Sequence, residues 1–318
     1  MKNETVTSQT ISEGALVTLV EKGAAPSPAR ANRFAGGIWR TLRSLSLKQK
    51  LGFAILLVYL AIALAAPALI THDPWAINRT EQGLTARMEP PSSRHLLGTT
   101  DLGRDLFSQL VIGTRATIIV GFLAAFCVTV IGTNMGLLSG YFGGWVDEVI
   151  MRLVDIAYVI PFVPFIIILI SLLEPSIWNI ILAIILLFWR TPTRVIRSQV
   201  LSLKTRPFVK AARVAGASEW RILYTQIAPN ILPLSFLYMT ISVGWAVITE
   251  ASVSFLGLGD PLVISWGSML NSAFLSGAAR HAWCWVVPPG MAIVLMVIAT
   301  FLVGEAAEEY ANPRLRER

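Results

Sequence analysis

Long uncharged apolar runs constrain this chain more than any other feature of its sequence. A helix that crosses a lipid bilayer needs about 20 consecutive, mostly apolar residues, because each residue rises about 1.5 Å and the hydrocarbon layer is about 30 Å thick. Such runs, with 54% hydrophobic and 14% charged residues overall, exclude an intrinsically disordered protein and an ordinary cytosolic enzyme. Five runs have the required length: Leu51–Ile70, Ala116–Leu138, Ile156–Leu173, Ile231–Thr249 and Trp283–Gly304.

A sixth run, Ser176–Trp189, is shorter than a full span. It reaches the required length if the helix continues through Arg190 and Arg194 and their guanidinium groups extend to the lipid headgroups. We therefore predict an all-α polytopic membrane protein with six transmembrane helices. The first run is not a cleavable signal peptide, since about 50 residues precede it and it is too long for the apolar region of such a peptide.

An even number of spans places both termini on one side of the membrane, and the basic residues indicate which side. The N-terminal tail, the turn 139–155, the loop 190–230 and the C-terminal tail hold 20 of the 26 Lys and Arg residues, and the other connections hold six. Basic residues accumulate on the cytoplasmic side. Both termini and the loop 190–230 are therefore predicted to be cytoplasmic. The net charge of +7 is a topology signal and needs no nucleic-acid partner.

The spans also divide the chain into parts. The tail is rich in Ser, Thr, Ala and Pro and is predicted to be largely disordered, although Ile38–Lys50 forms either a basic interfacial helix or a solvated lead-in. The predicted parts are a cytoplasmic tail (1–50), the first transmembrane helix (51–70), an extracytoplasmic cap loop (71–115), a core permease domain of five helices (116–308) that contains the loop 190–230, and a cytoplasmic tail (309–318).

The chain carries no catalytic or nucleotide-binding motif. It has no Gly-Lys pair, hence no P-loop, and no Gly-x-Ser-x-Gly nucleophile motif. The histidines, His72, His95 and His281, are too scattered for a His-x-x-x-His zinc site, and Cys127 and Cys284 are predicted to be reduced packing residues. We therefore expect no catalytic residue, no metal and no cofactor in this chain, so that any ATP is bound by another protein.

One carboxylate lies at the end of a predicted span. The interiors of the six runs contain no ionisable residue, whereas Glu250 directly follows the run Ile231–Thr249, the fifth along the chain. Ionisable groups at membrane depth often mark transport pathways, so Glu250 is a candidate for gating. The alternative is a helix-end carboxylate that pairs with a nearby cation at the outer interface.

Polar residues also occupy adjacent turns of the second span, at Thr129, Thr133 and Asn134. These side chains either face a transport path or form hydrogen bonds between helices. The second interpretation is at least as strong, because glycines follow at every fourth position, a spacing typical of close helix packing in membranes. They are Gly132, Gly136 and Gly140.

The most distinctive segment, Phe208 to Arg221, lies in the loop 190–230. Pro207 suits the first turn of a helix, Ser218 suits an N-cap, and Pro229 is expected to stop the helix that follows it. We interpret the segment as a plug for a groove on a partner, and an amphipathic helix lying on the membrane is the alternative. Gly216 is expected to let the partner approach closely, because it has no Cβ. The other small residues are Ala211, Ala212 and Ala215, and the apolar residues that flank them are Phe208, Val209, Val214 and Trp220, of which Phe208 and Trp220 are the expected anchors. The polar rim is Lys210, Arg213, Glu219 and Arg221.

This segment resembles the EAA loop of membrane subunits of bacterial ATP-binding-cassette importers. The resemblance rests on Ala211-Ala212, Gly216 and, thirteen residues further on, Pro229. More narrowly, the chain is similar to the C-type permease of the dipeptide, oligopeptide and nickel group, although Lys210 replaces the glutamate that names the loop. The similarity extends from about His95 to Arg314 and includes His95-Leu-Leu-Gly-Thr99, Gly103-Arg104-Asp105, the stretches 140–147 and 250–259, Trp266–Leu270 and Asn312-Pro313-Arg314.

The resemblance implies a type I importer permease fold in a bacterial or archaeal cytoplasmic membrane, in a chain that is not itself an enzyme. It implies two partner ATPase subunits that bind ATP and Mg, a homologous second permease subunit and an extracytoplasmic solute-binding protein. The segment from Phe208 to Arg221 is then the coupling helix, seated in a cleft of an ATPase. The residues assigned to ATPase coupling are Phe208, Val209, Lys210, Ala211, Ala212, Arg213, Ala215, Gly216, Ala217, Ser218, Glu219, Trp220 and Arg221.

Two other functions compete with this one. A self-sufficient ion-coupled carrier or channel would need no ATPase, but no internal repeat supports an inverted-repeat carrier. A membrane-embedded enzyme is disfavoured by the missing nucleophile and metal motifs. The sequence does not identify the substrate, so peptides, nickel chelates, opines and oligosaccharides all stay open.

Overall fold

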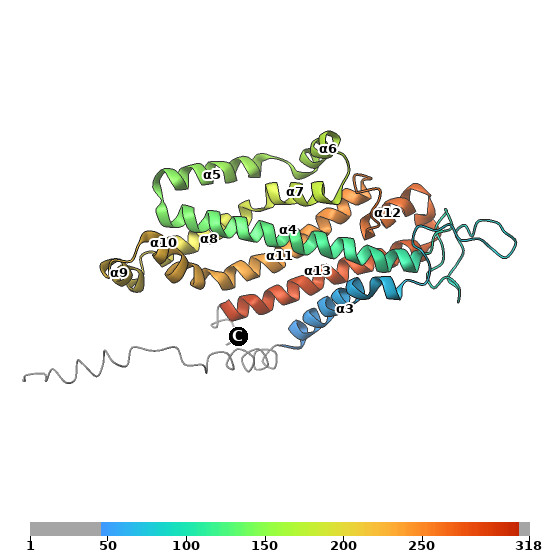
Figure 1. The fold of residues 1–318 in the computed structure, drawn as a ribbon, viewed down its shortest axis with the longest axis horizontal. Helices are drawn as coiled ribbons and strands as arrows, with labels where there is room; N and C mark the ends of the chain where they lie inside the picture. The colour runs from blue at the N-terminus through green and yellow to red at the C-terminus, as the bar shows by residue number, and fades with distance from the viewer. Residues whose placement is uncertain (1–45, 312–318) are drawn as a thin grey trace, which may run out of the picture. The chain divides into compact units, whose positions relative to one another are not determined.

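The computed structural model describes residues 46–311, and the elements discussed here belong to one compact unit that begins at Leu47. The predicted N-terminal tail up to residue 45 and the motif at residues 312–314 lie outside the described residues. The described part is helical and contains only isolated β-bridges (Figure 1). Its elements are α3 (Leu47–Leu69), α4 (Leu106–Phe142), α5 (Gly144–Val159), α6 (Phe162–Leu173), α7 (Ile177–Phe188), α8 (Arg190–Leu203), α9 (Pro207–Val214), α10 (Glu219–Arg221), the π-helix η1 (Ile222–Ile227), α11 (Ala228–Phe255), α12 (Trp266–Leu275), the 3-10 helix η2 (Ala278–Arg280) and α13 (Trp283–Ala311).

The helices confirm the all-α polytopic fold. In the described residues, five continuous helices are long and apolar enough to cross a membrane, and the bent pair α5–α6 raises the number to six if it is one span. The prediction of one straight helix over Ile156–Leu173 is wrong, because α5 and α6 meet at 90°. The break has a local cause: Ile160 precedes Pro161 and has φ −73° and ψ 117°, the extended conformation that a following proline imposes.

The second span is longer than its uncharged run. α4 begins at Leu106, ahead of the predicted Ala116, because Asp105 caps it: its Oδ2 accepts a hydrogen bond of 2.8 Å from the backbone N–H of Ser108. Arg115 interrupts the apolar run without interrupting the helix. Between α3 and α4 the cap loop therefore ends at Asp105.

The short sixth run does extend through its arginines, since α7 and α8 form one candidate span, Ile177–Leu203. The predicted extension of the guanidinium groups to headgroups stays a prediction, and both groups also have partners within the protein. Nη1 of Arg190 donates to the carbonyl of Ala157 at 2.5 Å, and Arg194 forms an ion pair with Asp155. Both guanidinium groups also lie over the ring of Tyr158, at 4.6 Å and 4.3 Å from its centroid. The arginines are thus used to hold α5 against α7 and α8.

The glycine stripe of α4 packs against α8. A Cβ on Gly132 would lie 2.5 Å from Cγ of Pro192, and one on Gly136 would lie 2.8 Å from both the carbonyl oxygen of Thr193 and Cβ of Ile196. Gly140 meets α8 in the same way. Small residues at four-residue spacing let two helices approach closely in a membrane, which explains why α4 and α8 make one of the most extensive contacts in the bundle.

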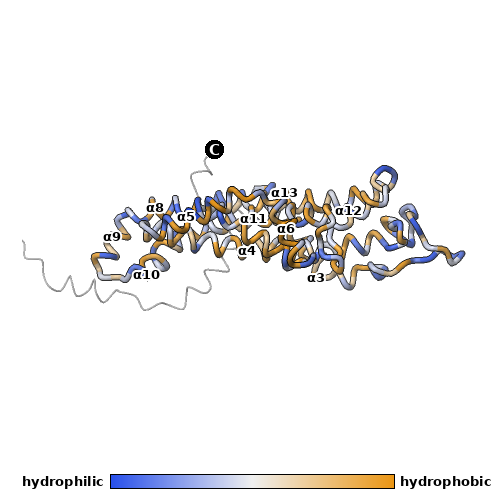
Figure 2. Tube along the Cα trace, turned by 90° about the horizontal axis from the view of Figure 1, so that it is seen from above, coloured by the Kyte–Doolittle hydropathy of each residue, from blue (hydrophilic) through white to orange (hydrophobic). Residues whose placement is uncertain are grey.

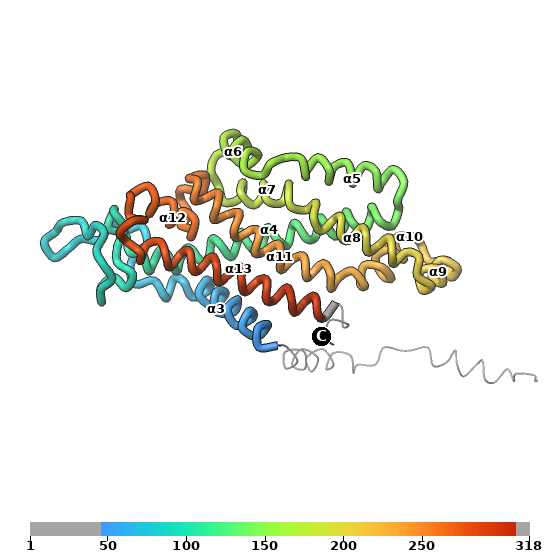
Figure 3. The backbone as a smooth tube through the Cα atoms, turned by 180° about the vertical axis from the view of Figure 1, so that it is seen from behind, coloured from blue at the N-terminus to red at the C-terminus, as the bar shows by residue number. Residues whose placement is uncertain are grey.

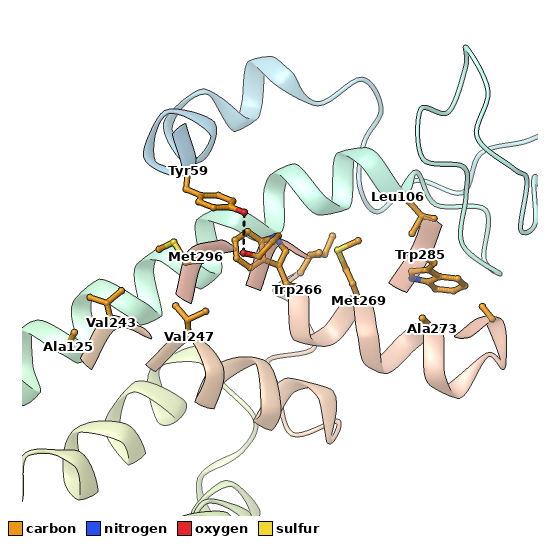
Figure 4. Close-up of a cluster of buried hydrophobic side chains, with 13 residues drawn as sticks. Tyr59, Leu106, Ala125, Val243, Val247, Trp266, Met269, Ala273, Trp285 and Met296 are labelled. Atoms are coloured by element: carbon orange, nitrogen blue, oxygen red, sulfur yellow. Dashed lines mark hydrogen bonds between the residues drawn. The ribbon is translucent and has the colours of Figure 1, made fainter. Parts of the chain in front are cut away.

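On its other side α4 packs against α3 and α11, and α11 packs against α13. Tyr59 of α3 joins these helices: its hydroxyl donates to the carbonyl of Ala292 at 3.1 Å, and its ring lies 5.4 Å from that of Trp266 (Figure 4). The indole N–H of Trp266 donates to the carbonyl of Leu110 at 3.1 Å. This buried cluster fixes α12 against α3, α4 and α13.

The cap loop and α9 lie at opposite ends of the helices (Figures 1 and 3). Hydrophobic residues dominate the middle of the bundle, whereas hydrophilic residues gather in the cap loop and around α9 (Figure 2). This separation agrees with the prediction that the two segments lie on opposite sides of a membrane. The assignment of α9 to the cytoplasm stays a prediction from the basic residues.

Candidate coupling surface

The predicted coupling segment is two short helices joined by a turn. α9 begins at Pro207, whose fixed φ suits the first helical position, and ends at Val214; α10 begins at Glu219. The segment Phe208–Arg221, interpreted as one coupling helix, is therefore two, and the second begins after Ser218, the predicted N-cap. The segment forms one end of the bundle, beside the C-terminal end of α4 (Figure 1).

The turn between the two helices is a Schellman motif around Gly216. The N–H of Gly216 donates to the carbonyl of Arg213 at 3.0 Å, and the N–H of Ala217 donates to the carbonyl of Ala212 at 3.1 Å. Gly216 has φ +77°, the left-handed conformation that this motif needs and that residues with a Cβ disfavour. Apart from its two chain neighbours, no atom of the described residues lies within 4 Å of the position that its Cβ would take. Within this chain, backbone conformation and not crowding explains the glycine.

The second helix is longer than predicted. Ser218 caps it by accepting a hydrogen bond from the N–H of Arg221 at 3.4 Å, and it then runs through η1 into α11 without a stop at Pro229. The prediction that Pro229 ends the helix is wrong. Proline has no N–H to donate to the carbonyl four residues earlier. A helix therefore continues past a proline most easily where this hydrogen-bond pattern has already changed. The π-helix η1, which ends two residues earlier at Ile227, has this changed hydrogen-bond pattern.

Apolar packing fixes the segment to the bundle. Val209 is fully buried with Leu137, Ile222 and other side chains of α4, α8 and η1, and Ala212 and Ala217 are half-buried against the same cluster. Val209 was predicted to flank the surface that meets the partner, but its side chain is buried and faces the inside of this chain. It anchors α9 to the rest of the protein instead.

Polar contacts fix the same segment to the end of α4. The Tyr141 hydroxyl donates to Oε2 of Glu219, and Nη2 of Arg213 lies 3.5 Å from that hydroxyl and 3.6 Å from Oε2. The pKa of the Arg213 guanidinium is raised above its usual value. The larger cause is the hydrogen bond to the Tyr141 hydroxyl, and the next is the negative charge of Glu219. Trp220 packs on the ring of Phe142, with centroids 5.3 Å apart. α9, α10 and α4 are thus connected through side chains as well as through the chain.

We expect Tyr141→Phe to loosen this connection without unfolding the protein. The ring and its packing stay, while the hydroxyl that joins Arg213 to Glu219 is lost, a change of about 1.5 kcal/mol, at the lower end for a hydrogen bond to a charged group because Glu219 is half exposed. Hydrogen exchange of the amides of α9 should then be several-fold faster than in the wild type. Exchange in α12, at the other end of the bundle, is the internal control and should not change. Equal exchange of α9 in both proteins would contradict the assigned role.

The outer face of the segment exposes large apolar side chains among polar ones. Val214 is 90% exposed, Trp220 is 57% exposed and Phe208 is 39% exposed. The other exposed residues of the predicted set are Lys210, Ala211, Arg213, Ala215, Gly216, Ser218, Glu219 and Arg221. We call the exposed positions from Phe208 to Arg221 the coupling surface.

A second polar cluster stiffens the bundle just beneath this surface. Arg197 of α8 donates from Nε and Nη2 to the two carboxylate oxygens of Asp147 at 2.5 Å each, and Ser139 of α4 also donates to that carboxylate. Nζ of Lys204 donates to the carbonyl of Gly140 at 2.9 Å. α4, α5 and α8 therefore form one connected support for the coupling surface.

Glu250 does not lie at a helix end. α11 continues to Phe255, and Glu250 is 2% exposed. Its Oε1 accepts a hydrogen bond from Ser254 at 2.7 Å, and Oε2 has no hydrogen-bond partner among the described residues. The described chain provides no cation for it, so the predicted ion pair at the outer interface is wrong. The carboxylate borders a hollow of about 10 Å³, lined also by Ile177, Asp260 and Ser265, which has room for about one water molecule.

The polar residues of α4 make contacts between helices. Thr133 donates to the hydroxyl of Ser235 on α11 at 2.9 Å, and Oδ1 of Asn134 accepts a hydrogen bond of 3.0 Å from Tyr224 on η1. The Thr129 hydroxyl is buried and has no hydrogen-bond partner among the described residues. These contacts favour the interhelical interpretation for Thr133 and Asn134, on the face of α4 that meets α11.

Two of the three histidines, which are far apart in the sequence, are neighbours in the fold. His72 and His95 have ring centroids 4.7 Å apart and both face Asp105, whereas His281 lies in the connection between η2 and α13. No motif in the sequence indicates this proximity, because His72, His95 and Asp105 do not stand at the spacing of a known metal site. Cys127 and Cys284 are free thiols, as predicted.

Comparisons of the sequence with known proteins assign the chain to a family. The profile of the family described as "Binding-protein-dependent transport system inner membrane component" matches residues 132–317, which contain the whole coupling segment. The chain is also 34% identical to the dipeptide transport system permease protein DppC of Haemophilus influenzae, over 84% of this chain and 90% of that protein. The chain belongs to this permease family.

Other relatives of the permease agree. It is 34% identical to the oligopeptide transport system permease protein OppC of Bacillus subtilis, over 84% of this chain and 85% of that one. It is 32% identical to the glutathione transport system permease protein GsiD of Pectobacterium atrosepticum, over 87% of this chain and 92% of that one. The permease is therefore a multi-pass protein of the cytoplasmic membrane and forms part of the translocation pathway of an ATP-binding-cassette importer, which has further subunits.

Proposed function

We propose that the permease couples solute import to ATP hydrolysis through the coupling surface. Two ATPase subunits bind ATP and Mg, a homologous second permease completes the pathway, and an extracytoplasmic solute-binding protein delivers the solute. The permease itself catalyses no reaction and binds no nucleotide, and both of its termini are cytoplasmic. The relatives' names support a peptide or a related small solute as the substrate.

The observation that carries this proposal is the contrast between the two faces of the coupling segment. Its inner face is held by the buried Val209 and by the Tyr141, Arg213 and Glu219 contacts, while Val214 and Trp220 are exposed on the outer face. Large exposed apolar side chains on a rigidly held support mark a binding site for another protein. A docked ATPase subunit can then move the segment as one body.

A continuous helix leads from the coupling surface toward Glu250. α10, η1 and α11 form one candidate span from Glu219 to Phe255, which is 37 residues and therefore about 55 Å long. A displacement at Glu219 reaches Glu250 through this helix, in which η1 is the one turn with π-helical hydrogen bonds among the elements α10, η1 and α11. We propose that Glu250 acts in gating at the far end, and that Thr129, whose hydroxyl has no hydrogen-bond partner among the described residues, lies beside the pathway along α4.

A labelling experiment tests the docking. In a protein with Cys127→Ala and Cys284→Ala, Val214→Cys is exposed and should react with a water-soluble maleimide when only the two permeases are present in vesicles. Addition of the ATPase subunits should reduce that rate at least ten-fold, because the side chain is then covered. Leu262→Cys, which is 83% exposed in the connection between α11 and α12, is the control. In vesicles made permeable to the reagent, so that both sides are reached, it should react equally in both states.

The same experiment separates the alternative function. If the segment lies on the membrane, as in a self-sufficient carrier, Val214→Cys is protected by lipid without any ATPase subunit. That result, or solute uptake by the permease alone with an ion gradient and no ATP, would overturn the proposal.

A further inference from the structure

Three side chains from separate parts of the chain meet at the end of the bundle opposite to the coupling surface. His72 follows α3, His95 lies within the cap loop, and Asp105 immediately precedes α4. Nδ1 of His95 lies 2.9 Å from Oδ1 of Asp105, and Nδ1 of His72 lies 4.0 Å from the same oxygen. One ligand atom from each residue falls within 4.8 Å of the other two. We propose that His72, His95 and Asp105 bind a divalent transition-metal ion such as Zn²⁺.

The distances suit one small ion. Zn²⁺ binds imidazole nitrogens at about 2.0–2.1 Å and carboxylate oxygens at about 2.0–2.2 Å, so two ligand atoms of a tetrahedral site lie ~3.3 Å apart. The 2.9 Å and 4.0 Å distances lie on either side of this value. Because both Nδ1 atoms face one oxygen, small side-chain rotations are sufficient to place all three atoms around an ion.

Asp105 is held in position for this role. Its two oxygens have different partners: Oδ2 accepts the 2.8 Å hydrogen bond from the N–H of Ser108 that caps α4, and Oδ1 faces the two imidazoles. The helix therefore fixes the orientation of the carboxylate without occupying Oδ1. Ligands that are oriented by a second contact in this way are typical of metal sites.

The carboxylate of Asp105 is buried, which favours the binding of a cation beside it. The side chains of Asp105 and His95 are 0% exposed, and a buried carboxylate is costly unless it is paired or coordinates a metal. Among the described residues no Lys or Arg forms an ion pair with Asp105. Nδ1 is the imidazole nitrogen that faces Asp105 in both histidines. A divalent ion would neutralise the carboxylate and bind the lone pairs of these two nitrogens.

One side of the cluster is open. The side chain of His72 is 26% exposed, and its Nδ1 lies 3.1 Å from the hydroxyl of Thr71. An ion can enter there, and either a water molecule or the hydroxyl of Thr71 can complete four ligands. The bound ion would join the end of α3, the cap loop and the start of α4, and so act as a structural staple for the cap.

The test uses the purified full-length permease without a polyhistidine tag. After removal of metals by a chelator, titration with Zn²⁺ should show one ion bound per chain, and Co²⁺ should give the visible absorption bands of a site with nitrogen and oxygen ligands. Zn²⁺ should also raise the thermal unfolding midpoint, because it binds the folded state.

Substitutions identify the ligands. His72→Gln removes a partly exposed ligand without disturbing the buried pair, and it should weaken Zn²⁺ binding at least ten-fold. His95→Gln should abolish it. His281→Gln is the matched control, because it removes the exposed histidine outside the cluster, and it should bind as the wild type does. The proposal is wrong if wild-type protein binds no ion, or if His72→Gln and His281→Gln bind Zn²⁺ equally. Because ATP-driven transport is not measured, these outcomes are independent of the proposed coupling function.

Discussion

Gly216→Val is expected to reduce ATP-driven transport at least ten-fold while the chain still inserts and assembles. The reason is the left-handed backbone at φ +77°, which closes the Schellman motif between α9 and α10. A residue with a Cβ loses about 1–2 kcal/mol in this conformation, and a β-branched residue loses more. Valine should therefore open the turn and move Val214 relative to Trp220, so that the coupling surface no longer matches its partner.

Transport and ATP hydrolysis measured together in reconstituted vesicles check this expectation. Gly216→Asn is the matched control, because asparagine tolerates the left-handed region, and it should keep most of the coupled transport. No atom of this chain crowds the position of the Cβ. If the asparagine variant fails as completely as the valine variant, the close approach of a partner is the constraint. A fully active Gly216→Val protein would refute both explanations.

Gly136→Ala is expected to destabilise the protein strongly for a change of one methyl group. The new Cβ would lie 2.8 Å from the backbone carbonyl of Thr193 and from Cβ of Ile196, neither of which can move unless α4 and α8 separate. Overpacking of this kind costs about 1–3 kcal/mol. The thermal unfolding midpoint in detergent should fall by several degrees.

The control is the same substitution at an open glycine. Gly290 lies in α13, and no atom is within 4 Å of the position of its Cβ, so Gly290→Ala should leave the midpoint unchanged or raise it slightly through helix propensity. The comparison removes the general effect of exchanging glycine for alanine in a helix. Equal midpoints for the two variants would show that α4 and α8 are not tightly packed at Gly136.

These two positions show how far sequence patterns can be interpreted. The four-residue spacing of Gly132, Gly136 and Gly140 predicts close packing of α4, but only the fold identifies α8 as the partner. Gly216 is part of the recognised loop pattern, yet the pattern does not reveal which physical need it meets. The structure assigns it to a backbone turn, because its φ angle is positive and its surroundings are open.

The errors at prolines have a common origin. Pro161 and Pro229 each carry the same local signal, yet α5 and α6 separate at the first, and the helix continues past the second. Proline removes one hydrogen bond and restricts its neighbour in both cases. The outcome depends on the flanking helix: η1 alters the ladder before Pro229, and buried Ile222, Leu223 and Ile227 hold that irregular turn against α4 and α8.

The sequence by itself determined the membrane class, the helical spans and the position of the coupling segment, because apolar run length, basic residues and small-residue spacing act locally along the chain. Only the tertiary structure decided that Val209 faces inward, that Glu250 is buried without a cation, and that His72, His95 and Asp105 meet. These features depend on the face that a helix turns to its neighbours or on contacts between separate segments, such as that between His72 and Asp105, which are 33 positions apart. Such contacts are set by helix packing, and no local pattern encodes them.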